Sequence, residues 1–523
     1  MNGAQKLIRT LVDCEVNVCF SNPGTSEMHF VAALDEVPEM RAVLGLFEGV
    51  VTGAADGYGR MTGRPAATLL HLGPGLGNGI ANLHNARRAR TPMVNVVGDH
   101  ARHHLENDPP LTADIESLAR PVSGWYRSSA SPGALAADTV EAVAAACGPP
   151  GVVATLVVPA DVSWLEAAGA VVSPRPRSGP RPVADEVVAG AAKALMSGEP
   201  AVILIGGGAT RRRGLLAASR VSERTGAKLL CETFPASLER GAGLPAVERL
   251  GYLAEFTVAQ LASARHLVLV DTVAPVSFFA YPDVPGYLVP EGCEVHVLAE
   301  AGAGEDAAGA LEALAEILGA PTDGARLQPS ERPGRPTGPL TAASASAAIG
   351  ALLPEGAIVS DEANTSSIFI PGATAGAPRH DWLCLTGGAI GQGMPVATGA
   401  AVACPDRPVL CLEADGSAMY TLQSLWTQAR EGLDVTTVIF NNGSYAILEM
   451  ELSRVGAGAP GPRAQGMLDI GRPDLDFAGL ARGMGVPAWR ATTAEEFTVQ
   501  LERALGEEGP VLVEAVLERV DRW

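Results

Sequence analysis

Glu413-Ala-Asp-Gly-Ser417, followed by Asn441-Asn-Gly443, is the part of this sequence that decides the fold. The carboxylate of Asp415 precedes the carboxamide of Asn442 by 27 positions. Residues 420–431 between them have a helical pattern, and an apolar run follows, so we expect strand, turn, helix, strand and turn. In a parallel sheet, this order brings Asp415 and Asn442 to one edge, where ligands of open α/β sheets bind.

Oxygen atoms at this edge can hold a divalent cation that carries a diphosphate. A hard cation such as Mg²⁺ takes a few protein oxygens and keeps other positions for phosphate and water. Asp415, Asn442 and the main-chain carbonyl near Ser444 supply such oxygens. Gly416, beside Ser417, lets the backbone approach the phosphate closely. The alternative is two unrelated solvated turns, which either half alone favours but the pair at this spacing does not.

The spacing resembles the thiamine diphosphate signature, which runs Gly-Asp-Gly, about two dozen residues and then Asn-Asn. Ala414 stands where that family usually has glycine, and because alanine is small we expect the turn to be kept. The sequence is similar to the acetolactate synthase large-subunit and benzoylformate decarboxylase family, most closely to its actinobacterial acetolactate-synthase-like proteins. Further matching stretches follow in family order: residues 20–27, 47–58, 70–79 and 387–395.

The chain of 523 residues is long enough for about three domains of ordinary size. Proline-rich stretches at 173–182 and 320–339 read as linkers, which predicts domains at 1–172, 183–319 and 340–523. Strands alternate with helices in each part, so we expect an α/β protein with three doubly wound parallel sheets. The resemblance implies that the first domain binds the pyrimidine and the third the diphosphate, with a middle domain between them.

Apolar runs bounded by turn residues mark the strands that this organisation needs. A helix is predicted from Gly49 to Arg60. The predicted strands are 16–20, 41–47, 66–71, 92–98, 152–158, 201–205, 228–231, 266–271, 357–360, 409–413, 435–440 and 511–515.

Glu48 is the second anchor of the predicted site. It follows a buried-looking strand, and a carboxylate in apolar surroundings is unfavourable unless it has a partner. The resemblance implies that Glu48 touches the cofactor's aminopyrimidine ring and favours the imino tautomer, whose imino group removes the thiazolium proton. The cofactor then supplies the carbanion chemistry. The alternative is an ordinary helix N-terminal glutamate, stabilised by the helix dipole.

The resemblance carries further residues into the site, one at a time. Gly388 would give backbone access, and Ile390 would lie under the bent cofactor, although a core isoleucine would look the same. Thr25 and His71 match positions that face substrate in benzoylformate decarboxylase, so we interpret them as catalytic. His103-His104 resembles the histidine pair of pyruvate decarboxylase, but a solvated loop is the better interpretation of that pair.

The expected reaction is addition to a small 2-oxo acid and loss of carbon dioxide, followed by protonation or by acyloin formation, as in acetolactate synthase. Residues that separate decarboxylase from carboligase depart from the family here: Ala280 replaces a histidine, and Leu448 a glutamate, with Glu449 one position away. The alternatives are a benzoylformate-type decarboxylase and a non-catalytic cofactor-binding paralogue. Retention of Glu48 argues against the paralogue.

A glycine run at 206–208 could indicate a dinucleotide, but a short run after a strand is weak evidence. The arginine and aspartate pattern by which acetolactate synthases hold FAD is not apparent in residues 270–281. We therefore expect no FAD. A nucleotide-dependent oxidoreductase remains an alternative that only this glycine run supports.

Net charge and cysteine usage bound the partners and the compartment. The charge of −20 and the pI near 4.9 disfavour binding to nucleic acid or to anionic membranes. Eight scattered cysteines without a Cys-x-x-Cys pair are typical of a reduced cytosolic protein, and no run has signal-peptide or transmembrane character. We expect a cytoplasmic enzyme. The resemblance implies a homodimer or homotetramer with active sites between subunits.

Overall fold

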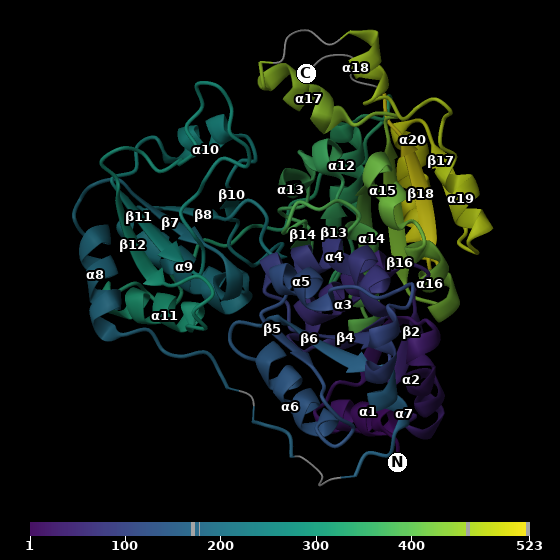
Figure 1. The fold of residues 1–523 in the computed structure, drawn as a ribbon. Helices are drawn as coiled ribbons and strands as arrows, with labels where there is room; N and C mark the ends of the chain where they lie inside the picture. The colour runs from purple at the N-terminus through teal and green to yellow at the C-terminus, as the bar shows by residue number, and fades with distance from the viewer. Residues whose placement is uncertain (169–172, 177, 457–460, 519–523) are drawn as a thin grey trace.

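The computed structural model describes residues 1–168, 173–176, 178–456 and 461–518 (Figure 1). Three mostly parallel β-sheets, each combined with helices, make up the chain, so the predicted α/β class with three doubly wound sheets is confirmed. The predicted end of the first domain at residue 172 and the last residue, 523, lie outside the described residues. No described helix combines the length and the apolar character that crossing a bilayer requires.

The first sheet has the strand order β2-β1-β3-β4-β6-β5 and is parallel throughout. Side chains that alternate along β1 enter two different cores: Phe20 packs in one and Cys19 in the other. Because both faces are covered, its central strands are mostly apolar, and the buried polar residues Thr68, Asn95 and Thr155 hydrogen-bond to one another across them. The elements are β1 (Val18–Asn22), β2 (Arg41–Leu44), β3 (Ala66–Leu70), β4 (Met93–Asp99), β5 (Trp125–Ser128), β6 (Val153–Pro159), α1 (Gly3–Asp13), α3 (Glu48–Thr62), α4 (Leu72–Ala89) and α6 (Leu135–Ala146).

The middle sheet has the order β10-β8-β7-β11-β12 and forms the separate lobe on the left of Figure 1. Strand β12 is at its edge, and the side chains of Val295 and Val297 are exposed there. The elements are β7 (Ala201–Ile205), β8 (Lys228–Cys231), β10 (Glu248–Arg249), β11 (His266–Val270), β12 (Glu294–Ala299), α8 (Asp185–Leu195), α9 (Arg212–Thr225), α10 (Ala254–Leu261) and α11 (Ala307–Ile317).

The third sheet has the order β17-β18-β16-β15-β13-β14-β9. Its edge strand β9 (Leu238–Arg240) comes from the middle part of the chain and pairs antiparallel with β14. The middle lobe is thereby joined to the third sheet by backbone hydrogen bonds. The other elements are β13 (Ile358–Glu362), β14 (His380–Cys384), β15 (Val409–Ala414), β16 (Val435–Asn441), β17 (Ala488–Ala491), β18 (Val511–Val516), α12 (Ala342–Leu352), α14 (Gly393–Ala403), α17 (Ala446–Arg454), α19 (Phe477–Gly483) and α20 (Ala494–Ala504).

Helices α3 and α14 join the first and third sheets by close backbone contact. A Cβ atom on Gly57 would lie 2.1 Å from the carbonyl oxygen of Val396, and one on Gly399 would lie 1.8 Å from that of Ala54. Since real side chains do not fit at such distances, glycine is required on both helices. One apolar core continues across this contact, which fixes the two sheets relative to each other.

The helix predicted over 420–431 is wrong in its start and in its continuity. The structure has two helices, α15 (Asp415–Thr421) and α16 (Ser424–Glu431). The first ends where Thr421 Oγ1 donates to the carbonyl oxygen of Gly391 (3.0 Å). Asp415 is therefore the first residue of a helix. The preceding Ala414 has ordinary extended backbone (φ −82°, ψ 149°), so alanine fits where the family usually has glycine.

Candidate active site

Asp415 connects the carboxyl ends of two neighbouring strands, β15 and β16. Its Oδ2 accepts hydrogen bonds from the backbone N–H groups of Asn442 (2.9 Å) and Gly443 (2.7 Å), and Oδ1 accepts from that of Gly416 (2.8 Å). The residue is 2% exposed. Burial raises the pKa of Asp415 above its ordinary value, and these hydrogen bonds oppose the rise. The carboxylate thus needs a further positive partner, which a bound cation would supply.

Asn442 and Ser444 complete a group of hard oxygen donors around Asp415. The carboxamide oxygen of Asn442 accepts the N–H of Ser444 (2.9 Å) and shapes the loop after β16. The hydroxyl of Ser444 donates to Glu449 Oε1 (2.7 Å). Glu449, which we left without a role from the sequence, therefore supports the loop through Ser444. The carboxylate of Asp415 and the carboxamide of Asn442 are oxygen ligands of the kind that Mg²⁺ prefers.

The glycines of the predicted diphosphate site differ in what requires them. Gly388 has φ +76°, and no atom lies within 4 Å of a Cβ built on it, so its backbone faces open space. A Cβ on Gly416 would lie 2.4 Å from the ring of Tyr445, so that ring requires the glycine. Ile390 is only half-buried, which leaves apolar surface for a ligand. Ser417 Oγ accepts from the side chain of Asn364 (3.0 Å).

A buried pair of carboxyl groups, Glu362 and Glu413, lies beneath the loop that carries Gly388 and Ile390. Glu362 accepts the N–H groups of Gly391 (2.7 Å) and of two residues after it. Burial raises the pKa of Glu362 to about 7, and burial together with Glu362 raises the pKa of Glu413 well above its ordinary value. The pair anchors the start of α14. In the sequence, only the charged residue at the end of the apolar run 409–413 indicates this buried pair.

Glu48 begins helix α3 and is 6% exposed. Its Oε2 accepts a hydrogen bond from Asn78 Nδ2 (3.0 Å), a residue of α4. Oε1 lies 3.3 Å from the position that a Cβ on Gly75 would take, and no described residue donates to it. One carboxylate oxygen is thus fixed by the protein while the other is left for a ligand, as a pyrimidine partner requires.

His71 and Glu27 form a hydrogen-bonded pair near Glu48. His71 Nδ1 lies 2.8 Å from Glu27 Oε2, and the backbone N–H of Gly24 donates to the same oxygen (2.9 Å). Burial raises the pKa of Glu27, and its bond to His71 opposes the rise. The side chain of His71 is 23% exposed but that of Glu27 only 2%, so the pair presents the imidazole outward. Thr25 is exposed and follows Gly24, whose backbone packs against the ring.

The sequence pattern does not indicate a role for Glu27, although this residue ends the matching stretch 20–27. Its Oε1 is buried without a hydrogen-bond partner, and a Cβ on Gly98 would lie 1.7 Å from that oxygen. Only the fold brings Glu27 to His71, because Glu27 follows β1 and His71 follows β3. Glu27 holds the ring of His71 in place through this contact.

His71→Ala is expected to lower turnover by about 100-fold, the lower end of what a positioned acid–base group contributes. The melting temperature should stay near wild type, because His71 is partly exposed and the buried Glu27 can keep a proton when its partner is removed. Both quantities are measured on one preparation, with His29→Ala, an exposed histidine, as the control. A collapse of the melting temperature with normal turnover of the folded fraction would make His71 a structural residue.

The predicted residues fall into two groups within one chain, one around Glu48 and His71 and one around Asp415 and Asn442. Asn82 links the backbone next to Glu48 to the loop that follows Ile390. Its Nδ2 donates to the carbonyls of Gly49 (2.8 Å) and Gly391 (3.1 Å). Among the described residues, no hydrogen bond or ion pair joins the side chains of Glu48 or His71 to those of Asp415 or Asn442. Within the single chain the two groups are therefore separate.

A cavity of about 550 Å³ lies away from both groups, between the first sheet's helices and the middle lobe. It is lined by the predicted glycine run. The N–H of Gly208 donates to Asp271 Oδ2 (2.9 Å) and that of Gly207 to Glu232 Oε1 (3.4 Å). Asp271 also forms an ion pair with Arg90. The backbone donors of the glycine run are thus already bonded to carboxylates of the protein.

The two ends of the chain match two family descriptions. Residues 1–118 match "Thiamine pyrophosphate enzyme, N-terminal TPP binding domain", and residues 372–515 match "Thiamine pyrophosphate enzyme, C-terminal TPP binding domain". These segments carry Glu48 and His71 on one side and Asp415 and Asn442 on the other. The chain belongs to the thiamine diphosphate enzyme family, of the acetolactate synthase and benzoylformate decarboxylase type, which confirms the predicted resemblance.

Individual relatives cover nearly the whole chain. It is 61% identical over 518 residues to "Putative acetolactate synthase large subunit IlvX" of Mycobacterium tuberculosis, covering 99% of each chain. It is 31% identical to the benzoylformate decarboxylase of Pseudomonas aeruginosa, covering 96% of each. The solved structure of the thiamine diphosphate-dependent 4-hydroxybenzoylformate decarboxylase of Rhodococcus jostii RHA1 matches with a TM-score of 0.87 and 25% identity over 100% of each chain.

Proposed function

We propose that this chain is a magnesium- and thiamine diphosphate-dependent enzyme that acts on a small 2-oxo acid as a decarboxylase or carboligase of the acetolactate synthase type. The observation that carries the proposal is Glu48, a buried carboxylate with one oxygen held by Asn78 and the other left for a ligand. A site that served only structure would not need such a carboxylate. When bound, thiamine diphosphate supplies a carbon nucleophile for the 2-oxo group and a thiazolium ring that accepts the electron pair released when carbon dioxide leaves.

The chain's own residues divide the work around the cofactor. Asp415, Asn442 and the carbonyl of Ser444 would hold the magnesium ion and through it the diphosphate. Glu48 would hold a proton at the pyrimidine ring. His71, oriented by Glu27 at 2.8 Å, would give or take a proton at the substrate.

Two alternatives stay open. The His71–Glu27 pair and the 31% identity to a benzoylformate decarboxylase favour a non-oxidative decarboxylase that releases an aldehyde. A non-catalytic cofactor-binding paralogue would release nothing. Product analysis of the protein with magnesium, thiamine diphosphate and a panel of 2-oxo acids separates them: acyloins indicate a carboligase, aldehydes alone a decarboxylase, and no carbon dioxide from any acid contradicts the proposal.

We further propose that the group around Glu48 and His71 and the group around Asp415 and Asn442 are each half of an active site, which a second copy of the chain completes. We call these two groups half-sites. Large apolar side chains next to each half-site are exposed in the single chain, and contiguous exposed apolar surface marks interaction sites. Those beside the first group are Met28 and Leu46, and those beside the second are Ile368, Met419 and Tyr420. A partner that paired Glu48 of one chain with Asp415 of the other would cover both surfaces.

Mixed dimers of Glu48→Gln and Asp415→Ala chains are expected to regain activity that neither variant has alone. In a two-fold dimer with shared sites, one site carries both changes and the other carries neither, so about half of wild-type activity per dimer returns. The variants are co-expressed with different tags, and the doubly tagged dimer is purified and assayed. A mixed dimer as inactive as its parents would show that each site lies within one chain.

We also propose that the enzyme works without FAD. A dinucleotide phosphate at the glycine run would meet the carboxylates of Asp271 and Glu232, which already accept the N–H groups of Gly207 and Gly208. The backbone donors of Gly207 and Gly208 that would hold such a phosphate are therefore already occupied.

The domain boundaries and the compartment also remain proposals. We propose domains at 1–172, 183–319 and 340–523. None of the cysteines that the structure describes is in a disulfide bond and most are buried, which suits a reducing cytoplasm.

A further inference from the structure

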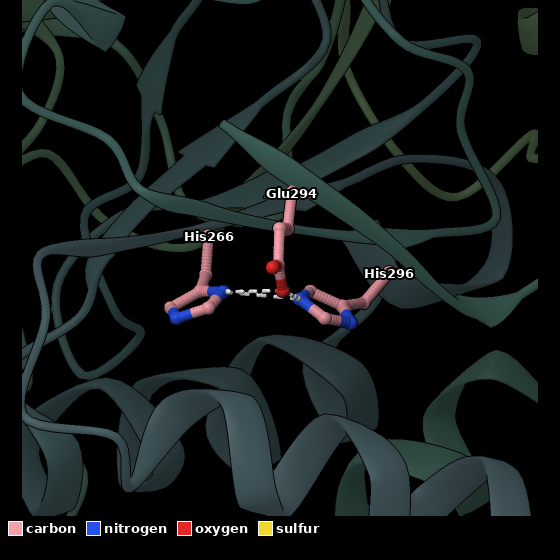
Figure 2. A group of neighbouring side chains, drawn as sticks. All are labelled: His266, Glu294 and His296. Atoms are coloured by element: carbon pink, nitrogen blue, oxygen red, sulfur yellow. Dashed lines mark hydrogen bonds and ion pairs between the residues drawn. The ribbon is translucent and has the colours of Figure 1, made fainter. Parts of the chain in front are cut away.

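We propose that His266, Glu294 and His296 form a binding site for a divalent metal ion of the zinc type in the middle lobe (Figure 2). His266 begins β11, and the other two residues lie at the start of β12. Figure 2 shows the two imidazole rings on either side of the Glu294 carboxylate, with one ligand atom of each residue turned toward a common point. Neither the proposed reaction nor its cofactor uses these residues.

The separations between the three ligand atoms suit a metal ion. His266 Nδ1 lies 3.1 Å from His296 Nε2, and Glu294 Oε2 lies 3.6 Å from the first and 3.8 Å from the second. Ligands held at 2.0–2.2 Å in a tetrahedron around zinc are about 3.3 Å apart. Glu294 is beyond ordinary hydrogen-bond distance from both rings, so a hydrogen bond does not explain why its carboxylate points between them.

A fourth residue, Glu199, fixes the orientation of His266. Its Oε2 lies 3.1 Å from His266 Nε2, the ring atom that faces away from the cluster. When Nε2 donates its proton to Glu199, Nδ1 presents a lone pair toward Glu294 and His296. A carboxylate behind a histidine is the usual support of a metal-ligating imidazole, because it fixes the tautomer and makes the ring a better ligand.

The sheet register brings the ligands together. His266 is opposite Glu294 in the β11–β12 pairing, and His296 follows two positions later, so all three project from one face.

Two imidazoles and one carboxylate select the metal. This set is typical of zinc sites that keep a position for water, whereas Mg²⁺ prefers oxygen ligands alone. The ion would tie the edge strand β12 to β11. It would also hold the returning end of residues 271–293, whose Tyr281 donates to Glu451 Oε2 (2.6 Å) on helix α17 of the third part.

The test measures bound zinc with the cofactor site already filled. The full chain is treated with chelator, reloaded with excess magnesium and thiamine diphosphate, and dialysed against Zn²⁺. Elemental analysis is expected to find one zinc ion per chain more in wild type than in His296→Ala. His296→Ala removes a direct ligand, so its zinc affinity should fall by more than about 100-fold, and Glu199→Gln should lower it by about 10- to 100-fold.

Glu294→Gln and Glu291→Gln form the matched pair of controls, since both glutamates are exposed and lie three positions apart. Only Glu294→Gln should lose zinc. Zn²⁺ should also raise the melting temperature of wild type and of Glu291→Gln but not that of His296→Ala. Equal zinc in wild type and His296→Ala, or equal loss in the two glutamine variants, overturns the site. Neither result bears on the proposed reaction, because activity is not the readout.

Discussion

Glu48→Gln is expected to slow proton exchange at the thiazolium carbon of bound thiamine diphosphate by about 100- to 10,000-fold, the range for a positioned acid–base group. Glutamine has the size of glutamate and can still accept the hydrogen bond from Asn78 that Glu48 accepts at 3.0 Å. It cannot carry the negative charge that holds a proton at the pyrimidine ring. Cofactor affinity should therefore stay near wild type while exchange slows.

To measure the exchange, the holoenzyme is mixed with deuterated buffer and quenched after short times. The proton that remains on the thiazolium carbon is then quantified by nuclear magnetic resonance. Glu39→Gln, a change at an exposed glutamate of the same part of the chain, is the control. Exchange at the wild-type rate in Glu48→Gln, with cofactor bound, would remove Glu48 from the catalytic residues. It would also return the non-catalytic paralogue to consideration.

Asp415→Ala is expected to weaken magnesium-dependent binding of thiamine diphosphate by an order of magnitude or more, in keeping with the loss of a direct metal ligand. The change removes a charged oxygen. It also removes the acceptor of the N–H groups of Asn442 and Gly443, so the loop after β16 loses its anchor. Calorimetric titration with the cofactor, at fixed magnesium, measures the affinity.

Asp415→Asn separates the two contributions, because asparagine keeps a hydrogen-bond acceptor but loses the charge. Asp434→Ala is the control, since Asp434 is an exposed aspartate that precedes β16 at the opposite edge of the sheet. Unchanged affinity in Asp415→Ala would refute the metal site. An equal loss in Asp434→Ala would show that the effect is one of folding.

The sequence located the central strands of each sheet because their side chains are buried on both faces and their apolar runs are continuous. It missed β14, which is fully buried yet contains His380 and Asp381. Arg211 and Arg407 neutralise Asp381 at 3.0 and 2.6 Å, and both come from distant segments. It also missed β5 and β12, whose exposed positions break the apolar pattern. Local pattern does not reveal long-range ion pairs or sheet edges.

The candidate site, too, has residues that the local pattern predicts and residues that only the fold brings together. Asp415 and Asn442 could be paired from the sequence because they end consecutive strands, and consecutive parallel strands that are neighbours share an edge. Glu27 could not be assigned to His71 in that way, since only the order of β1 and β3 in the sheet brings them within 2.8 Å. The cluster of His266 and Glu294 likewise depends on a strand register across residues 271–293.

The buried pair of Glu362 and Glu413 has a consequence for behaviour in alkaline solution. With Glu362 at a pKa of about 7 and that of Glu413 raised well above the ordinary value, the folded chain keeps a proton that the unfolded chain releases near pH 4.5. Stability from this proton is complete below about pH 4.5 and is lost as pH rises through about 7. Cys411 on β15 lies beside the pair, with its Sγ 3.9 Å from Glu413 Oε2, and the charge of Asp361 on β13 also raises the pKa of Glu413.

Urea unfolding between about pH 6 and pH 9 should show the unfolding free energy of wild type falling by up to about 1.4 kcal/mol per pH unit for each proton kept. Glu413→Gln has no such proton to lose, so its curve should be flatter; an equal slope in both proteins would contradict the linkage. Glu362 accepts the N–H of Gly391 at the end of the loop that carries Gly388 and Ile390. The position of that loop thus depends on a proton held by the two carboxyl groups. In alkaline solution this loop, which we propose binds the cofactor, should lose its ordered position before the rest of the fold unfolds.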